Sequence, residues 1–232
     1  MTKARDAGQR GTLSVVLCAV LTLLLAAGPA GAANLKNARI FFEFNLTDDD
    51  LGVQVFLDAD AWRTLTLVDP GGNPILQMDA HGVLGILGLT ELFWESSEPS
   101  PQEVLALFAP GQYTFEVTDV DGNTLTGMAT LSHDLPLPAV VTFPEEDGSV
   151  DPADTTISWT HPQLNQLAAF EVVVENVTSG VLTAAFTLPA SATTVHIAPE
   201  ALTGPGKKYK VEVIAIAKNG NKTIVEVPFS TQ

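Results

Sequence analysis

Apolar and polar side chains alternate over much of the chain, with the period of two that half-buried β-strands show. Residues 40–46 alternate in this way, and residues 53–57 do so again after a polar turn, which predicts an antiparallel hairpin. A further strand over 64–68 leads into the turn sequence Asp69-Pro70-Gly71-Gly72-Asn73, and residues 75–78 would run back from it. The alternation therefore predicts a unit built from short strands.

One helix is predicted within this unit, over residues 101–109. Ser100-Pro101-Gln102-Glu103 offers a capping serine, a proline at the first helical position and a glutamate that reaches back to complete a capping box. Such a short helix is marginal in water, so it must pack on the sheet to persist. Its predicted apolar face consists of Val104, Leu107 and Phe108.

A second hairpin follows the helix, because residues 113–117 and 125–131 flank Asp121-Gly122, a dipeptide typical of tight hairpin turns. The order of hairpins, Asp-Pro-Gly turn and short helix loosely resembles an immunoglobulin-like sandwich of secreted bacterial proteins. That resemblance covers residues 33–136 and implies a β-sandwich with one short helix.

The C-terminal part of the chain shows the alternation most clearly. Tyr209, Val211 and Val213 share one face of a predicted strand, while Lys210 and Glu212 point to the other face. One face of this strand is therefore expected in a core and the other in water. Two upstream residues on a shared face, Ile157 and Trp159, predict the opposing layer.

These residues resemble the core signature of a fibronectin type III domain, over about residues 138–232. The signature is a tryptophan on the second strand, Trp159, a leucine shortly before a Pro-Gly turn, Leu202, and a tyrosine that opens an alternating strand, Tyr209. The resemblance implies a sandwich in which the Tyr209 hydroxyl returns to upstream backbone. It implies no activity, because the same scaffold serves adhesion, spacing and ligand binding.

The fold class expected from these patterns is all-β, with two β-sandwich domains in tandem. The domains span residues 33–136 and 137–232, and the boundary lies near Leu135-Pro136-Leu137-Pro138. Alternating prolines favour an extended, semi-rigid joint.

The first 32 residues have the order of a secretory signal peptide. Basic residues precede an apolar run over 13–27, and Ala30-Gly31-Ala32 supplies small residues for cleavage, so the mature chain is expected to begin at about Ala33. The apolar run is too short for a permanent membrane anchor, and Cys18 lacks the small residues of a lipoprotein cleavage site. We therefore expect a secreted or periplasmic protein with no stable membrane anchor and no disulfide.

The chain is strongly acidic, with a formal net charge of −16. The excess is concentrated in residues 33–136, which hold three basic and sixteen acidic side chains, whereas residues 137–232 hold five and ten. Such a field repels nucleic acids and anionic membrane surfaces. Cations and basic surfaces are the partners that this charge favours, although acidic surfaces also serve solubility alone.

Clustered aspartates make calcium the cofactor to consider. Asp48, Asp50 and Asp69 are expected at one end of the first strands if the chain runs up and down. Calcium takes about six to eight oxygen ligands, of which three carboxylates and nearby carbonyls supply a part. The alternative is that these aspartates form turns through their own hydrogen bonds. A second candidate set at the opposite end is Asp58, Asp60 and Asp79.

A candidate ligand-binding face lies in Gly88–Ser96. As a strand, this segment would place Glu91, Phe93 and Glu95 on one face, where an aromatic ring between carboxylates could bind a sugar or a basic peptide. Burial of the aromatics under the predicted helix explains the same residues without a ligand.

No catalytic motif is present, and consecutive strand residues such as Ser132-His133-Asp134 cannot hydrogen-bond in series as a triad. We therefore expect a non-catalytic binding or structural module that takes a protein or carbohydrate ligand. The rival is a small polysaccharide hydrolase with paired carboxylates on the N-terminal domain. A third reading is a subunit that adds an edge strand to a neighbour. Three glycosylation sequons begin at Asn45, Asn176 and Asn221.

Overall fold

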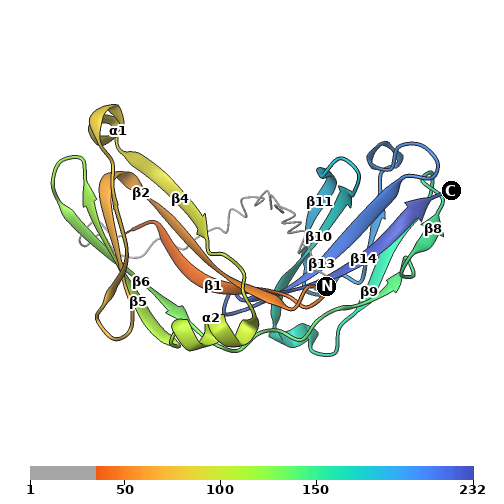
Figure 1. Cartoon of the computed structure of the whole chain (residues 1–232), viewed down its shortest axis with the longest axis horizontal. Coiled ribbons are helices and arrows are strands. Elements are labelled where there is room, and N and C mark those ends of the chain that lie inside the picture. Colours follow the sequence, from red (N-terminus) through yellow and green to blue (C-terminus); the bar gives the residue numbers. More distant parts are fainter. Residues whose placement is uncertain (1–34) are drawn as a thin grey trace, which may run out of the picture.

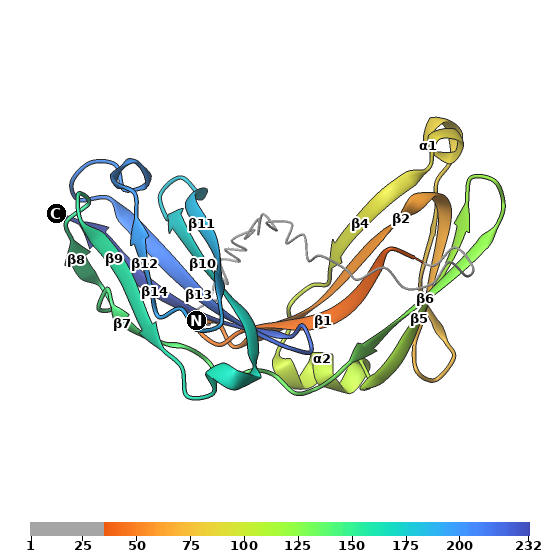
Figure 2. The same cartoon turned by 180° about the vertical axis from the view of Figure 1, so that it is seen from behind.

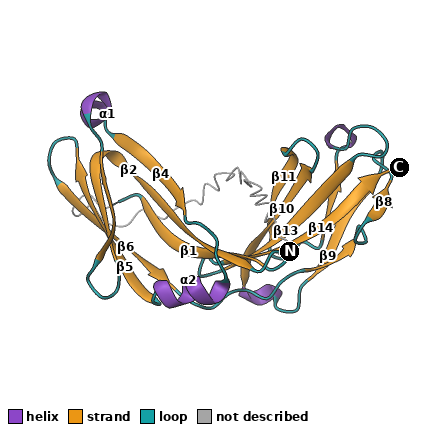
Figure 3. Ribbon diagram, in the orientation of Figure 1, coloured by secondary structure: helices purple, strands orange, loops and turns teal. Residues whose placement is uncertain are grey.

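The computed structural model describes residues 35–232, so the predicted signal peptide and Cys18 lie outside the described residues. Two β-sandwiches form the arms of an open V, and helices contribute little to either arm (Figures 1 and 3). The all-β prediction is confirmed. Among the described residues, no helix has the length and apolar character needed to cross a bilayer.

The N-terminal sandwich contains six strands and two short helices. In chain order these are β1 (Asn37–Asn45), β2 (Asp50–Val68), β3 (Pro74–Asp79), α1 (Gly82–Leu87), β4 (Leu89–Glu95), α2 (Pro101–Leu107), β5 (Gly111–Asp119) and β6 (Thr124–Leu131). The predicted hairpins form, since β1 pairs with β2, β2 with β3, and β5 with β6, all antiparallel. Trp62 and Phe115 are among the side chains fully buried between the layers.

Strand β2 corrects the predicted number of strands. The two strands predicted over 53–57 and 64–68 are one strand of 19 residues. Its first part pairs with β1 and β4, and its last part pairs with β3 and β5, with a register shift between Asp58 and Trp62. Thus β2 belongs to both layers of the sandwich, and its two ends lie far apart.

Helix α2 confirms the predicted start but not all of the predicted face. The Ser100 amide donates to Glu103 Oε2 at 3.2 Å, which is half of the capping box. The helix ends at Leu107, two residues before the predicted end, and the Leu107 side chain is 78% exposed. Val104 and Phe108 pack on the core as predicted, together with Leu105.

The C-terminal sandwich has a three-stranded and a four-stranded layer. In chain order its strands are β7 (Val140–Phe143), β8 (Gly148–Val150), β9 (Thr155–Thr160), β10 (Leu167–Asn176), β11 (Val181–Pro189), β12 (Thr194–Ile197), β13 (Lys208–Ala217) and β14 (Lys222–Thr231). The layers have the orders β12-β9-β7 and β11-β10-β13-β14, and β8 pairs with β14. Trp159, Leu202 and Tyr209 are all buried in the core between these layers, in agreement with the fibronectin type III resemblance.

The Tyr209 hydroxyl accepts a hydrogen bond from the Thr203 amide at 2.9 Å, six residues upstream. Tyr209→Phe should therefore lower the free energy of unfolding by roughly 1–3 kcal/mol, because the amide loses its acceptor in a part-buried place. Denaturant melts of the whole chain measure this. An unchanged midpoint would mean that water replaces the hydroxyl at no cost.

The joint between the sandwiches is more than the predicted proline segment. Strand β1 pairs in parallel with β14, with Glu43 opposite Lys222 and Asn45 opposite Ile224, so one sheet runs from β11 to β6 through both arms (Figure 2). The Leu46 amide also donates to the Ile224 carbonyl at 3.0 Å. The two cores nevertheless remain separate clusters, on either side of the predicted boundary.

We refer to the junction where β1 pairs with β14 as the seam between the two sandwiches. Asn221 forms hydrogen bonds across this seam and cannot also carry a glycan in the folded chain. The side chain is 1% exposed, and its Nδ2 donates to the carbonyls of Ser132 and Asp134. A glycan requires that nitrogen, so this sequon is closed by the fold.

Candidate functional site

Three glutamates converge on the outer face of the sheet formed by β1, β2 and β4, which lines the inner side of the V (Figures 1 and 2). Glu43 lies on β1, Glu95 ends β4, and Glu98 lies in the loop that follows. One carboxylate oxygen from each lies within 4.8 Å of the other two, and among residues 35–232 this is the one acidic group of three or more arranged so closely. We refer to these residues as the glutamate cluster.

Strand register brings the cluster together. Glu43 is the partner of Gly52 across β1 and β2, and Glu95 is the partner of Gln54 across β4 and β2. Side chains two residues apart share a face, so the carboxylates of Glu43 and Glu95 stand on the same side of β2. The register of these three strands therefore positions two of the three carboxylates.

Gly52 makes room for the third. A Cβ at this position would lie 3.1 Å from Glu98 Cγ, 3.3 Å from Glu98 Oε1 and 3.7 Å from Glu95 Oε1. The missing side chain therefore lets the loop fold Glu98 back over β2, where its carboxylate reaches the other two.

Gln54 lies on β2 opposite Glu95 and is fully buried. Its Nε2 donates to Glu95 Oε1 at 2.8 Å. The Oε1 atom on the same amide is buried and accepts no hydrogen bond from the described residues. A buried acceptor without a donor is uncommon in folded proteins, so this oxygen calls for a ligand or a water.

Positive charge reaches the cluster from the other sandwich. Lys222 Nζ lies 3.1 Å from Glu43 Oε2 and 3.2 Å from Glu171 Oε2, so one ammonium serves two carboxylates. Burial raises the pKa of Glu43 although Lys222 opposes the shift. Partial burial, together with the charges of Glu95 and Asp50, raises the pKa of Glu98 to about 7. When all three carboxyl groups are ionised, they carry more negative charge than the one ammonium of Lys222 offsets.

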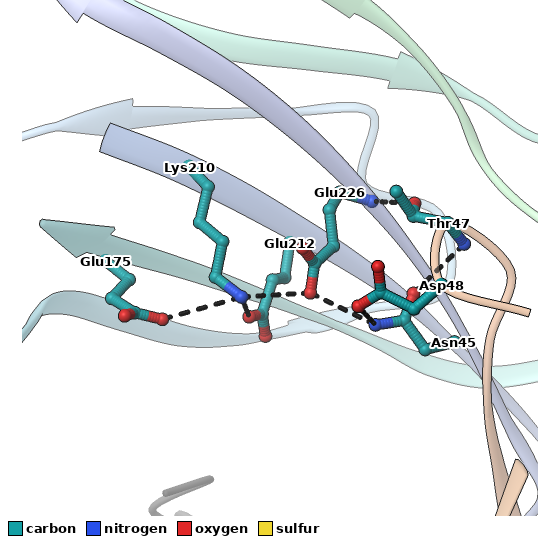
Figure 4. A network of polar contacts seen from close by, with 7 residues as sticks. All are labelled: Asn45, Thr47, Asp48, Glu175, Lys210, Glu212 and Glu226. Carbon is teal, nitrogen blue, oxygen red and sulfur yellow. Dashed lines mark hydrogen bonds and ion pairs between the residues drawn. The ribbon is translucent and has the colours of Figure 1, made fainter. Parts of the chain in front are cut away.

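A second charged network crosses the seam nearby and is centred on one lysine (Figure 4). Lys210 Nζ lies 2.9 Å from Glu212, 3.0 Å from Glu226 and 3.5 Å from Glu175. Burial opposes the charge on Lys210, but the hydrogen bonds and charges of Glu212 and Glu226 raise its pKa. Asn45 Nδ2 donates to both Glu226 and Asp48, which joins the N-terminal sandwich to the network. These contacts hold β14 to the β1–β2 turn.

The structure does not bring together the predicted calcium ligands. Asp48 and Asp50 lie where β2 begins, whereas Asp69 lies beyond its other end. Strand β2 bends between Asp58 and Thr64 and passes from the layer of β1 and β4 into the layer of β3 and β5, so its two ends belong to different layers. Asp69 instead forms a turn: it accepts hydrogen bonds from the Asn73 amide and side chain, which lower its pKa. For Asp69 the turn-forming alternative describes the structure.

The second aspartate set lies toward the α1 end of the sandwich, as the up-and-down path predicted. Asp58 lies opposite Glu91 on β4, Asp60 pairs with Lys36 at 2.7 Å, and Asp79 lies opposite Thr64. Among the described residues these three carboxylates do not form a group with oxygens within 4.8 Å of one another.

The predicted face of β4 forms as expected. Glu91, Phe93 and Glu95 alternate with Leu92 and Trp94, which pack on the core. Phe93 is 40% exposed, so burial explains the tryptophan but not the phenylalanine. Across β2 these three residues meet Asp58, Phe56 and Gln54. Glu95 is thus shared between the predicted face and the glutamate cluster.

Sequence reasoning missed Glu43, Gln54 and Glu98. Glu43 reads as an ordinary outward position of an alternating strand, and Glu98 lies in a Ser-rich and Pro-rich loop. Their contact depends on the register of β1, β2 and β4, which no local pattern contains. A glycine at position 52 opposite an acidic position was the one available signal, because a glycine within a strand often marks a close approach.

Ser132, His133 and Asp134 do not form a hydrogen-bonded series. Ser132 Oγ donates to Asp134 Oδ2 at 3.0 Å, while His133 Nε2 lies 2.8 Å from the Phe108 carbonyl oxygen. The histidine therefore contacts backbone and not the serine.

No family model matches the chain, and no curated protein matches it. Solved structures similar to it include the FN1–FN3 domains of chicken CNTN1, at 9% identity and a TM-score of 0.34, covering 85% of this chain and 69% of that one. A tetra-tandem repeat from the extending region of a large adhesion protein is 16% identical with a TM-score of 0.31, covering 84% and 50%. A structure concerned with host cell surface retention of a 1.5-MDa bacterial ice-binding adhesin is 15% identical with a TM-score of 0.26, covering 86% and 66%.

This chain thus spans about half of the large adhesion protein structure and about two thirds of the adhesin structure.

Proposed function

We propose that the protein is a non-catalytic, secreted or cell-envelope module that binds a protein partner through the tip of its N-terminal arm. The observation that carries this proposal is helix α1, an apolar turn with no buried residue. Its four large aliphatic side chains are exposed as follows: Val83 70%, Leu84 54%, Ile86 79% and Leu87 67%. Contiguous exposed apolar surface is typical of interaction sites.

The position of α1 supports a recognition role. The helix forms the connection between β3 and β4 and projects from the far end of the arm (Figure 1). Gly82 and Gly88 flank it with positive φ of 57° and 78°. A Cβ at Gly88 would meet Ala61 and Val120 at 2.8 Å, so this end is held close to the sheet. The apolar side chains are therefore presented on a fixed base.

A protein pocket fits this surface better than a bilayer or a sugar. The N-terminal sandwich carries sixteen acidic and three basic side chains, which opposes approach to an anionic membrane. Aliphatic side chains offer a sugar neither hydrogen bonds nor an aromatic stacking face. The adjoining Glu91–Glu95 face of β4, with Phe93 exposed, would meet a basic rim of the same partner.

The rival hydrolase would need a cleft that holds two separated carboxylates. A cavity of about 200 Å³ at the domain joint is lined by residues that include Leu135, His161 and Lys218. A second cavity of about 520 Å³ lies beside β7 and β14. Neither cavity includes a member of the glutamate cluster.

The test replaces the apolar tip. We expect the double variant Val83→Ser, Ile86→Ser to retain the thermal stability of the wild type, because neither side chain is buried, and to lose its partner. The control is Leu107→Ser, which removes an equally exposed leucine from α2. Each purified protein is immobilised against the secreted and envelope fractions, and the captured proteins are quantified by mass spectrometry.

A partner retained by wild type and Leu107→Ser but lost by the double variant supports the proposal. Identical captured sets for all three proteins would contradict it. Release of reducing ends from polysaccharide by the wild type would contradict the non-catalytic part of the proposal.

A further inference from the structure

We propose that Glu43, Gln54, Glu95 and Glu98 form a binding site for one calcium ion beside the seam between the two sandwiches. The site is separate from the apolar tip and does not depend on the proposed partner. It also differs from both aspartate sets, neither of which brings three carboxylate oxygens within 4.8 Å of one another among the described residues.

The spacing of the oxygens suits a shared ion. Ligands on opposite sides of a calcium ion, each at about 2.3–2.6 Å, lie roughly 4.6–5.2 Å apart. The three carboxylates of the glutamate cluster each place an oxygen within 4.8 Å of the others. An ion between them would therefore require only small side-chain adjustments.

Gln54 is an independent sign of a ligand. Gln54 is a neutral residue, so its position does not follow from the clustering of acidic side chains. It is fully buried, and its Nε2 donates a 2.8 Å hydrogen bond to Glu95. The adjacent Oε1 has no donor among the described residues. Amide oxygens are common calcium ligands, so an ion at the cluster would satisfy this atom together with the carboxylates.

Lys222 contacts the cluster at Glu43. Its ammonium comes from β14 and lies 3.1 Å from Glu43 Oε2 and 3.2 Å from Oε2 of Glu171 on β10, so Glu43 faces the C-terminal sandwich. Glu95 and Glu98 lie on the β4 side of Glu43 and repel each other. A divalent ion on that side would leave the Lys222 contact in place, and Glu43 would bridge the ion to the second sandwich.

The geometry favours calcium over magnesium. Four ligands come from three strands and a loop, and Glu98 is exposed and able to adjust, which suits the variable coordination of calcium. Glu43 is 2% exposed, so an ion that contacts it must shed water on that side. Magnesium dehydrates reluctantly and requires near-ideal octahedral geometry.

The test is isothermal titration calorimetry of the whole purified protein after treatment with a chelator. We expect one saturable calcium site per chain and markedly weaker binding of magnesium. Glu98→Gln should weaken calcium binding by about tenfold or more, because it removes one of three ligand charges. Glu95→Gln, which preserves an acceptor for Gln54 Nε2, is the second variant and should act in the same direction.

The matched control is Glu91→Gln, on the same face of β4 but outside the cluster, and its calcium affinity should equal that of the wild type. Thermal melts in calcium chloride and in sodium chloride of equal ionic strength separate site binding from screening. No saturable heat, equal binding of magnesium, or equal loss in Glu91→Gln and Glu98→Gln would overturn the assignment.

Discussion

Trp159→Ala is expected to lower the free energy of unfolding by about 3–5 kcal/mol, because it empties a site in the centre of the C-terminal core. The indole is 1% exposed and meets Phe170 edge-on, with ring centroids 5.4 Å apart. Its Nε1 has no hydrogen-bond partner among the described residues, so packing accounts for its contribution. The loss should appear as a lower denaturant midpoint.

The measurement uses the whole chain, because β14 is paired with β1 and a fragment of residues 137–232 would lack that contact. Phe143→Ala provides the control, since this aromatic residue of the same sandwich is 40% exposed and should cost much less. If both variants melt like the wild type, Trp159 does not lie in the core.

The sequence predicted the C-terminal sandwich better than the N-terminal one. Trp159, Leu202 and Tyr209 combine alternation with a familiar order, and each lies in the core as expected. In the N-terminal sandwich the strands were found, but the continuity of two of them was not. Residues 58–63 contain no glycine or proline, and the chain changes direction through them as one bent strand without a separate turn.

The continuity of β2 changes the surroundings of the predicted calcium residues. Asp58 and Asp60 lie inside β2, and the two ends of β2 near Asp50 and Asp69 belong to different layers. The glutamate cluster arises instead from the register of β1, β2 and β4. Side-chain direction can be inferred from a strand's own alternation, whereas register between strands is determined by turns and packing that lie outside each strand.

Two other features had no local signal. Helix α1 is an apolar segment interrupted by Gly85, which neither a period of two nor a period of 3.6 identifies as a helix. The parallel pairing of β1 with β14 joins residues about 180 positions apart, and the sequence of neither strand indicates which strand it pairs with. Both strands read as ordinary members of their own sandwiches.

Asn221→Ala is expected to lower the free energy of unfolding by about 3 kcal/mol, because it removes three hydrogen bonds across the seam. The Phe42 amide donates to Asn221 Oδ1 at 2.9 Å, and Asn221 Nδ2 donates to the Ser132 carbonyl at 2.8 Å and the Asp134 carbonyl at 3.0 Å. All three partners belong to the N-terminal side. Phe42 is fully buried, so water cannot readily replace the lost acceptor.

Chemical denaturation of the whole chain measures the change, with Asn123→Ala as the control. Asn123 also uses its side-chain amide, donating to Asp119 at 2.8 Å, but it lies in an exposed turn remote from the seam. Its loss should therefore shift the midpoint far less. Small-angle scattering adds a second readout, because weakening the seam should broaden the range of angles between the two arms. Equal midpoints and equal scattering for the two variants would show that the β1–β14 backbone pairing holds the arms together without Asn221.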